Sequence, residues 1–170
     1  MRPTKKITTI AILVTLALVL HIVELFLPIP FIVPGFKLGL ANIVTVTALC
    51  LFGFGETLLI VLLRTFLAAF LTGAISSFFY SVAGGILSLL VMFLVYRYLD
   101  KYVSLTGVSV LGAVAHNVGQ LLVASIILDT FAVFSYLPIL LLSGIATGYF
   151  VGLVSRSLLG YIRGKVVKSI

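Results

Sequence analysis

The sequence predicts an all-α integral membrane protein, a single domain over residues 1–170 built as a bundle of six transmembrane helices with both termini in the cytoplasm. Of its 170 residues, 62% are hydrophobic and 9% are charged, and the mean hydropathy is +1.38. In water-soluble domains roughly a quarter of the residues are charged, so this composition excludes a water-soluble domain. The apolar stretches are long and continuous instead of alternating, which favours helices over an outer-membrane barrel.

The first predicted span covers residues 4–26 and follows a basic start. The chain cannot continue as a regular helix through Pro28 and Pro30, because proline lacks a backbone N–H and biases the preceding residue away from helix. The apolar run has no small-residue cleavage site, so we expect it to stay in the membrane and not to be removed as a signal peptide. Residues 27–37 then form the longest connection between helices.

Five further spans are predicted, and they cover residues 38–52, 56–71, 76–98, 107–128 and 136–162. The second and third are short, and only Gly53-Phe54-Gly55 separates them. They are therefore either two spans or one re-entrant hairpin, and in the second case the number of full crossings falls to four. Glu56 suits the start of the third helix, where the helix dipole favours an acid.

The basic residues collect on one side of this predicted arrangement. The chain has 11 Lys and Arg residues against 4 Asp and Glu, a net charge of +7. With six spans and the N-terminus inside, Lys37 is external, Arg64 lies within a span, and the others are cytoplasmic: Arg2, Lys5, Lys6, Arg97, Lys101, Arg156, Arg163, Lys165 and Lys168. Such an excess is typical of cytoplasmic connections, so the charge pattern supports both termini inside.

Polar side chains within apolar spans are the candidate functional residues, because they cost free energy unless they face the bundle interior or a cavity. Arg64, in the middle of the third span, keeps its charge and suits a carboxylate or phosphate. It binds either an anionic ligand or an internal partner such as Glu24. His21 and Glu24 are three residues apart and share a helix face, which points inward or lies at the headgroup level.

Two more groups of residues in the spans have both a functional and a packing interpretation. In the fifth span His116, Asn117 and Gln120 predict a polar stripe, for ligand contact or for hydrogen bonds between helices. Phe79 belongs to an aromatic run that either stacks on a ligand or forms an interfacial belt.

Small residues at four-residue spacing predict close helix contacts. They are Gly144, Gly148 and Gly152 in the sixth span and Ala11 and Thr15 in the first. Contact within the bundle or with another membrane subunit would use such residues equally well.

The motifs of several enzyme classes are missing from the sequence. It contains no G-x-x-x-x-G-K-[ST] phosphate loop, so ATP hydrolysis by that route is excluded. Its four acids are scattered, and Cys50 and the two histidines have no zinc-binding spacing. We therefore expect no catalytic residues, no metal site and no cofactor of its own.

Three motifs resemble a known family. They are the Pro-rich connection followed by Lys37-Leu-Gly-Leu-Ala-Asn42, the Leu51-Phe-Gly-Phe-Gly-Glu56 segment, and Ala115-His-Asn-Val-Gly-Gln120. Together they are similar to the substrate-binding S components of energy-coupling factor (ECF) vitamin transporters. The closest similarity is to the branch described as heptaprenyl diphosphate synthase component I or Gx transporters.

The resemblance implies a protein of the bacterial cytoplasmic membrane that captures a vitamin-sized or cofactor-sized molecule from outside. Flavins, quinone precursors and haem-like molecules fit the polar and aromatic residues, and two histidines, His21 and His116, would suit haem iron. The implied partners are a transmembrane coupling subunit, contacted through Ala11-x-x-x-Thr15, and two cytoplasmic ATPases that use ATP. Thr15 replaces the usual second alanine of that contact.

By position in the motifs, Lys37, Asn42, His116, Asn117 and Gln120 are candidate ligand contacts. The alternative to transport is a non-catalytic membrane accessory subunit of a polyprenyl diphosphate synthase in quinone biosynthesis. The chain lacks the paired carboxylates that hold magnesium in a diphosphate-transfer enzyme, so catalysis itself is not expected.

Overall fold

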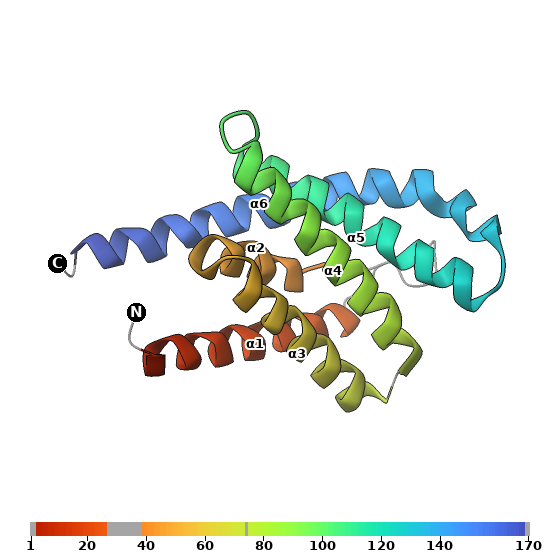
Figure 1. Cartoon of the computed structure of the whole chain (residues 1–170), viewed down its shortest axis with the longest axis horizontal. Helices are drawn as coiled ribbons and strands as arrows, with labels where there is room; N and C mark the ends of the chain where they lie inside the picture. Colours follow the sequence, from red (N-terminus) through yellow and green to blue (C-terminus); the bar gives the residue numbers. More distant parts are fainter. Residues whose placement is uncertain (1–2, 27–38, 74, 169–170) are drawn as a thin grey trace.

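The computed structural model describes residues 3–26, 39–73 and 75–168, and six α-helices and one 3₁₀ helix account for nearly all of them (Figure 1). The helices are α1 (Pro3–Phe26), α2 (Ala41–Phe52), α3 (Phe54–Thr72), α4 (Ile75–Tyr98), α5 (Leu105–Ile127), the 3₁₀ helix η1 (Phe131–Tyr136) and α6 (Leu137–Lys168). The predicted all-α class is confirmed, and each helix lies where an apolar span was predicted.

Five of these helices are long and apolar enough to cross a membrane, and α2 is the exception. With 12 residues α2 is roughly 18 Å long, against about 30 Å for the hydrocarbon core of a bilayer. The prediction of a second span from residue 38 extends beyond this helix, which begins at Ala41. The sixth helix is longer than predicted and continues to Lys168.

Successive helices run back and forth, so the start of α1 and the end of α6 lie at the same end of the molecule (Figure 1). The α2–α3 and α4–α5 connections also lie toward that end, and the α3–α4 and α5–α6 connections lie toward the other. Among the described basic residues, Lys5 and Lys6 lie in the first turn of α1, Arg97 in the last turn of α4 and Lys101 in the α4–α5 connection. Arg156 of α6 lines the same groove as Ser104 of that connection. We call this end of the molecule, where α1 starts, the basic end.

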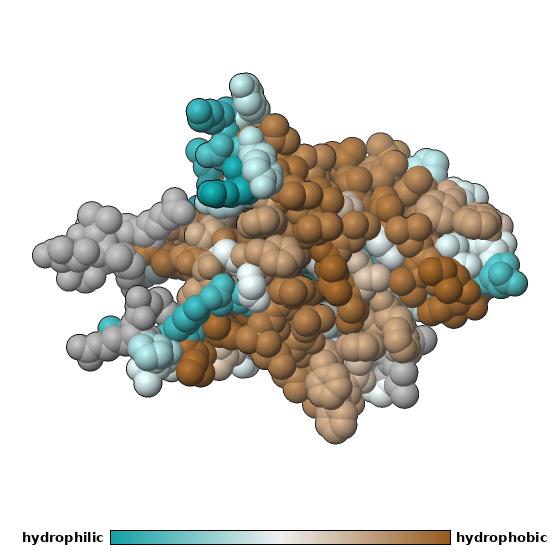
Figure 2. Space-filling model, viewed as in Figure 1, coloured by the Kyte–Doolittle hydropathy of each residue, from teal (hydrophilic) through white to brown (hydrophobic). Residues whose placement is uncertain are grey.

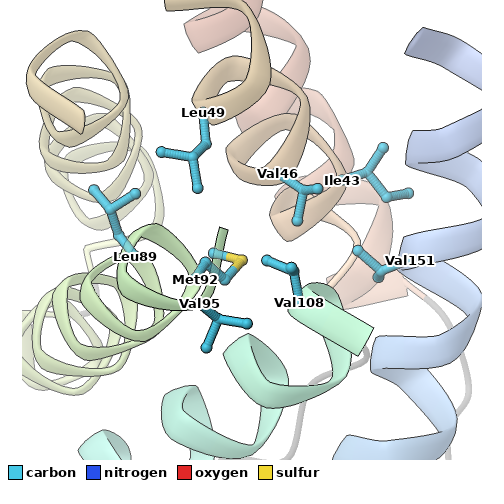
Figure 3. Close-up of a cluster of buried hydrophobic side chains, with 8 residues drawn as sticks. All are labelled: Ile43, Val46, Leu49, Leu89, Met92, Val95, Val108 and Val151. Atoms are coloured by element: carbon cyan, nitrogen blue, oxygen red, sulfur yellow. The ribbon is translucent and has the colours of Figure 1, made fainter. Parts of the chain in front are cut away.

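The short helix α2 is the centre of the bundle. Its first nine residues, Ala41–Leu49, are all buried, and it contacts α1, α3, α4 and α6. One face packs against α1 and α3 through Val44, Ala48 and Ile60. The opposite face joins a second core cluster from α2, α4, α5 and α6: Ile43, Val46, Leu49, Leu89, Met92, Val95, Val108 and Val151 (Figure 3). A helix buried on all sides explains why its sequence shows almost no polar face.

The outer surface of the bundle is apolar. Between 22% and 33% of the most apolar stretch of each long helix is buried inside the chain, and large hydrophobic side chains cover the remainder. Figure 2 shows this as continuous hydrophobic surface over the middle of the molecule, with hydrophilic residues toward the ends. A soluble monomer rarely exposes such an area, so lipid is the natural environment of these helices.

Candidate functional site

Arg64 lies near the middle of α3 and is buried, with 6% of its surface exposed. Gly85 of α4 faces it, because a Cβ at Gly85 would lie 3.8 Å from the Arg64 Nη2 atom. Glu24 of α1 is the carboxylate whose charge acts on the guanidinium. Within the described part of the chain, the Arg64 Nε atom has no hydrogen-bond partner. Arg64 is therefore a buried cation with a hydrogen-bond donor that no described residue uses.

Glu24 is also buried and holds the backbone that leads into α2. Its Oε1 accepts a hydrogen bond from the N–H of Gly39 at 2.5 Å, and Gly39 O accepts from Asn42 N at 2.8 Å. Gly39 has φ +72°, and a Cβ there would lie 2.9 Å from Asn42 Nδ2, so glycine is required at this turn. The Glu24 carboxylate is therefore shared between a backbone N–H and the charge of Arg64.

A small cavity lies beside Arg64, between α1, α3 and α4. Its volume is about 10 Å³, and its lining residues are His21, Arg64, Thr65, Ala68, Ala69, Thr72, Phe78 and Ser81. That space holds about one water molecule. Of the predicted candidates, His21 and Arg64 line this cavity. Glu24 and Asn42 do not line it, and they are linked to each other through Gly39.

His116 and Gln120 of α5 lie on the other side of α4, against Gly84. A Cβ at Gly84 would lie 2.9 Å from His116 O, 3.0 Å from His116 Cε1 and 3.0 Å from Gln120 Cγ. Gly84 therefore faces these two residues, whereas the adjacent Gly85 faces Arg64. Our sequence reasoning did not single out this glycine pair, although two adjacent glycines within a long apolar helix indicate a packing or functional constraint.

Asn117 has a different environment from His116 and Gln120. It is buried at the contact between α5 and α6, where its Nδ2 donates to Leu140 O at 2.7 Å. A Cβ at Gly144 would lie 2.9 Å from the same Nδ2. The three residues of the predicted polar stripe therefore do not share one environment, because His116 and Gln120 face α4. Asn117 makes a hydrogen bond between helices, as the packing interpretation expected.

The three glycines of α6 also face α5. A Cβ at Gly144 would lie 3.6 Å from the backbone of Ala113, one at Gly148 2.7 Å from Val110 Cα, and one at Gly152 2.6 Å from Thr106 Cα. The glycine stripe therefore makes a close helix contact within the bundle. The glycine face of α6 is packed against α5.

The remaining candidates lie apart from the cavity. Phe79 is 54% exposed and packs edge-on against Phe78, at a centroid distance of 5.6 Å, and Phe78 is the residue of this run that lines the cavity. Ala11 and Thr15 are exposed on α1, and Thr15 Oγ1 donates to Ala11 O at 3.0 Å. Lys37 lies outside the described residues.

The four acids lie in separate parts of the structure. Glu24 is buried at the α2 entry, Glu56 forms a salt bridge with Lys6 at the basic end, and Asp100 and Asp129 are exposed in two different connections. In residues 3–26, 39–73 and 75–168, no group of three or more His, Cys, Asp and Glu side chains is close enough to hold a metal ion. The arrangement supports binding of an anion at Arg64 better than acid–base chemistry by paired carboxylates.

A family model described as heptaprenyl diphosphate synthase component I matches residues 13–158, from the middle of α1 to the second half of α6. The chain belongs to this family. No curated protein and no solved structure matches the sequence. The heptaprenyl diphosphate synthase component I match includes every described candidate residue except Ala11. The family is named for one component of a larger system, so its members are expected to act with partners.

Proposed function

We propose that this protein is the substrate-binding S component of an ECF-type importer, which captures an anionic vitamin-like or cofactor-like molecule in the membrane for uptake by partner ATPases. The observation that carries the proposal is Arg64, a guanidinium buried among α1, α3 and α4 beside a cavity. An arginine at this depth is costly unless it is paired. Glu24, the acid whose charge acts on Arg64, already accepts a hydrogen bond from Gly39. A ligand carboxylate or phosphate would complete the pairing.

Ligand entry requires the bundle to open, because the cavity has room for about one water molecule. The contacts between α3 and α4 at the cavity include small residues, Ala68, Ala69 and Ser81, that can separate with little loss of buried apolar surface. His21, Phe78 and Ser81 would then contact the body of the ligand while Arg64 binds its charge. Quinone precursors, flavins and haem-like molecules with an anionic group all match this chemistry.

The direct test is to purify the chain in mild detergent and to record the absorption spectrum and the mass spectrum of the molecule that comes with it. A Soret band, a flavin spectrum or a quinone mass identifies the ligand class. A protein that neither carries nor binds any of these ligands, and that fails to co-purify with a coupling subunit, contradicts the importer proposal.

The orientation of the bundle is part of the same proposal. We place the basic end in the cytoplasm, because cytoplasmic connections are enriched in Lys and Arg. In a Cys50→Ser background, we expect a membrane-impermeant maleimide to label Thr130→Cys in intact cells, since Thr130 is exposed at the other end. Lys101→Cys, exposed at the basic end, should be labelled only after permeabilisation. The reverse labelling pattern would invert the topology.

The exposed face of α1 is the proposed contact for the coupling subunit, through Ala11 and Thr15. Bulky residues block the close helix approach that small residues allow. We therefore expect Ala11→Leu and Thr15→Leu to reduce co-purification of the coupling subunit at least several-fold while ligand content stays unchanged. Ala146→Leu, at an exposed alanine of α6, is the matched control and should have no effect. Equal losses in all three variants would argue against a specific contact on α1.

A second function, suggested by the family name, is that of a non-catalytic membrane accessory subunit of a polyprenyl diphosphate synthase. The two functions differ in one measurable outcome. Stimulation of prenyl-chain elongation when the purified chain is added to its synthase partner would support the accessory role. Saturable binding of a vitamin-like ligand by the chain alone would support the importer role.

A further inference from the structure

A groove lies between α5 and α6 at the basic end, apart from the Arg64 cavity between α1, α3 and α4. Its volume is about 510 Å³, and its sides are formed by residues near the start of α5 and in the second half of α6. No residue that lines the Arg64 cavity also lines this groove.

Two glycines of α6 hold α5 and α6 close together beside this groove. Gly148 and Gly152 bring the two backbones into contact, because Cβ atoms there would lie 2.7 Å from Val110 Cα and 2.6 Å from Thr106 Cα. Larger residues stand on either side of this contact. Leu111 of α5 and Leu153 of α6 are 41% and 42% exposed. Both leucines line the groove, so part of its wall is exposed apolar surface of the kind that faces lipid.

The polarity of the groove changes along its length. Because α5 and α6 are antiparallel, Ser104, Thr106 and Arg156 lie together at its outer end. Ser104 caps α5, with its Oγ accepting from Gly107 N at 3.2 Å, so the positive end of the helix dipole lies here beside the exposed guanidinium. The groove then becomes apolar inward, along Val110, Leu111 and Leu153.

We propose that this groove binds an anionic phospholipid. Its phosphodiester lies at Arg156 and the start of α5, and one acyl chain follows Val110, Leu111 and Leu153 toward the membrane interior. The positive end of the groove complements the anionic headgroup, and its apolar walls complement the acyl chain. In a bilayer leaflet the headgroup lies at the surface and the acyl chain points inward, which is the same order. Basic pockets between transmembrane helices bind anionic headgroups by this chemistry.

The chain contains no tryptophan, which allows a single fluorescent reporter in the groove. Tyr149 lines the groove and is 57% exposed, so Tyr149→Trp places the reporter there. The full chain is reconstituted in phosphatidylethanolamine vesicles that contain a minor fraction of brominated lipid, either phosphatidylglycerol or phosphatidylethanolamine. We expect stronger quenching by brominated phosphatidylglycerol. The control reporter Phe66→Trp, at an exposed residue of α3, should respond equally to both lipids.

Adding Arg156→Gln to the Tyr149→Trp chain should lower the preference for phosphatidylglycerol about five-fold, the effect of one basic residue near an anionic surface. Lys5→Gln removes the same charge at the basic end on α1, which packs against α2 and α3, and should leave the preference intact. The proposal is overturned if Tyr149→Trp shows no lipid preference, if Phe66→Trp shows the same one, or if the two charge variants behave alike. Relief of the quenching by micromolar farnesyl diphosphate would assign the groove to a prenyl diphosphate and overturn it as well.

Discussion

Arg64→Gln is expected to weaken binding of the anionic ligand by at least about thirty-fold, the effect of breaking a buried charge pair worth 2 kcal/mol or more. Arg64 is buried and its Nε has no hydrogen-bond partner among the described residues, so the proposed ligand anion would lose its paired charge in this variant. The dissociation constant of the co-purified ligand, measured by calorimetry in detergent, gives the result. Arg97→Gln, at an exposed arginine of α4, is the control and should bind normally.

A double-variant cycle with Glu24→Gln separates ligand binding from internal pairing. If Arg64 serves only to neutralise Glu24, then Arg64→Gln leaves a buried unpaired carboxylate and destabilises the fold, and the double variant regains stability. If Arg64 binds ligand, affinity stays low in the double variant whatever its stability. Thermal unfolding followed by size-exclusion chromatography, together with the calorimetry, distinguishes the two outcomes.

Gly119→Ala should destabilise the bundle by about 1–3 kcal/mol, the usual cost of overpacking a close contact. A Cβ at Gly119 would lie 2.9 Å from Ala83 O and 3.0 Å from Gly84 Cα. These are backbone atoms of α4, so no side-chain rotation relieves the contact and the two helices must separate. The fraction of protein that stays monodisperse after heating in detergent reports the loss.

Gly160→Ala is the matched control for this substitution. A Cβ at Gly160 of α6 meets no described atom within 4 Å, and alanine favours the helix by up to about 1 kcal/mol relative to glycine. This variant should therefore be as stable as the natural protein or slightly more so. Equal destabilisation by both alanines would mean that the α4–α5 contact is not the cause.

The helices were predictable from the sequence because they depend on long apolar runs and on a few residues that interrupt them. Gly53, with φ +96°, and Gly73, with φ +67°, end α2 and α3 near the predicted positions. The burial of Arg64 followed from the cost of a charge in lipid. These properties depend on local sequence and on the membrane, and not on which helices pack together.

The pairing of helices could not be predicted in the same way. Asn117 and Gln120 are three residues apart on α5, yet one faces α6 and the other faces α4. The glycine spacing in α6 predicted a close contact but not its partner, which proved to be α5. Phe78 and Phe79 are adjacent and chemically identical, and only the packing of α4 decides that Phe78 lines the cavity.

The half-length helix α2 has a consequence for the order in which the protein is assembled. A segment of 12 residues is too short to cross a bilayer on its own. It joins α3 directly at Gly53, and the two helices pack together. We therefore expect α2 to enter the membrane only with α3, as a helical hairpin. Truncation after residue 52 should leave α2 outside the bilayer, whereas truncation after residue 73 should bury it.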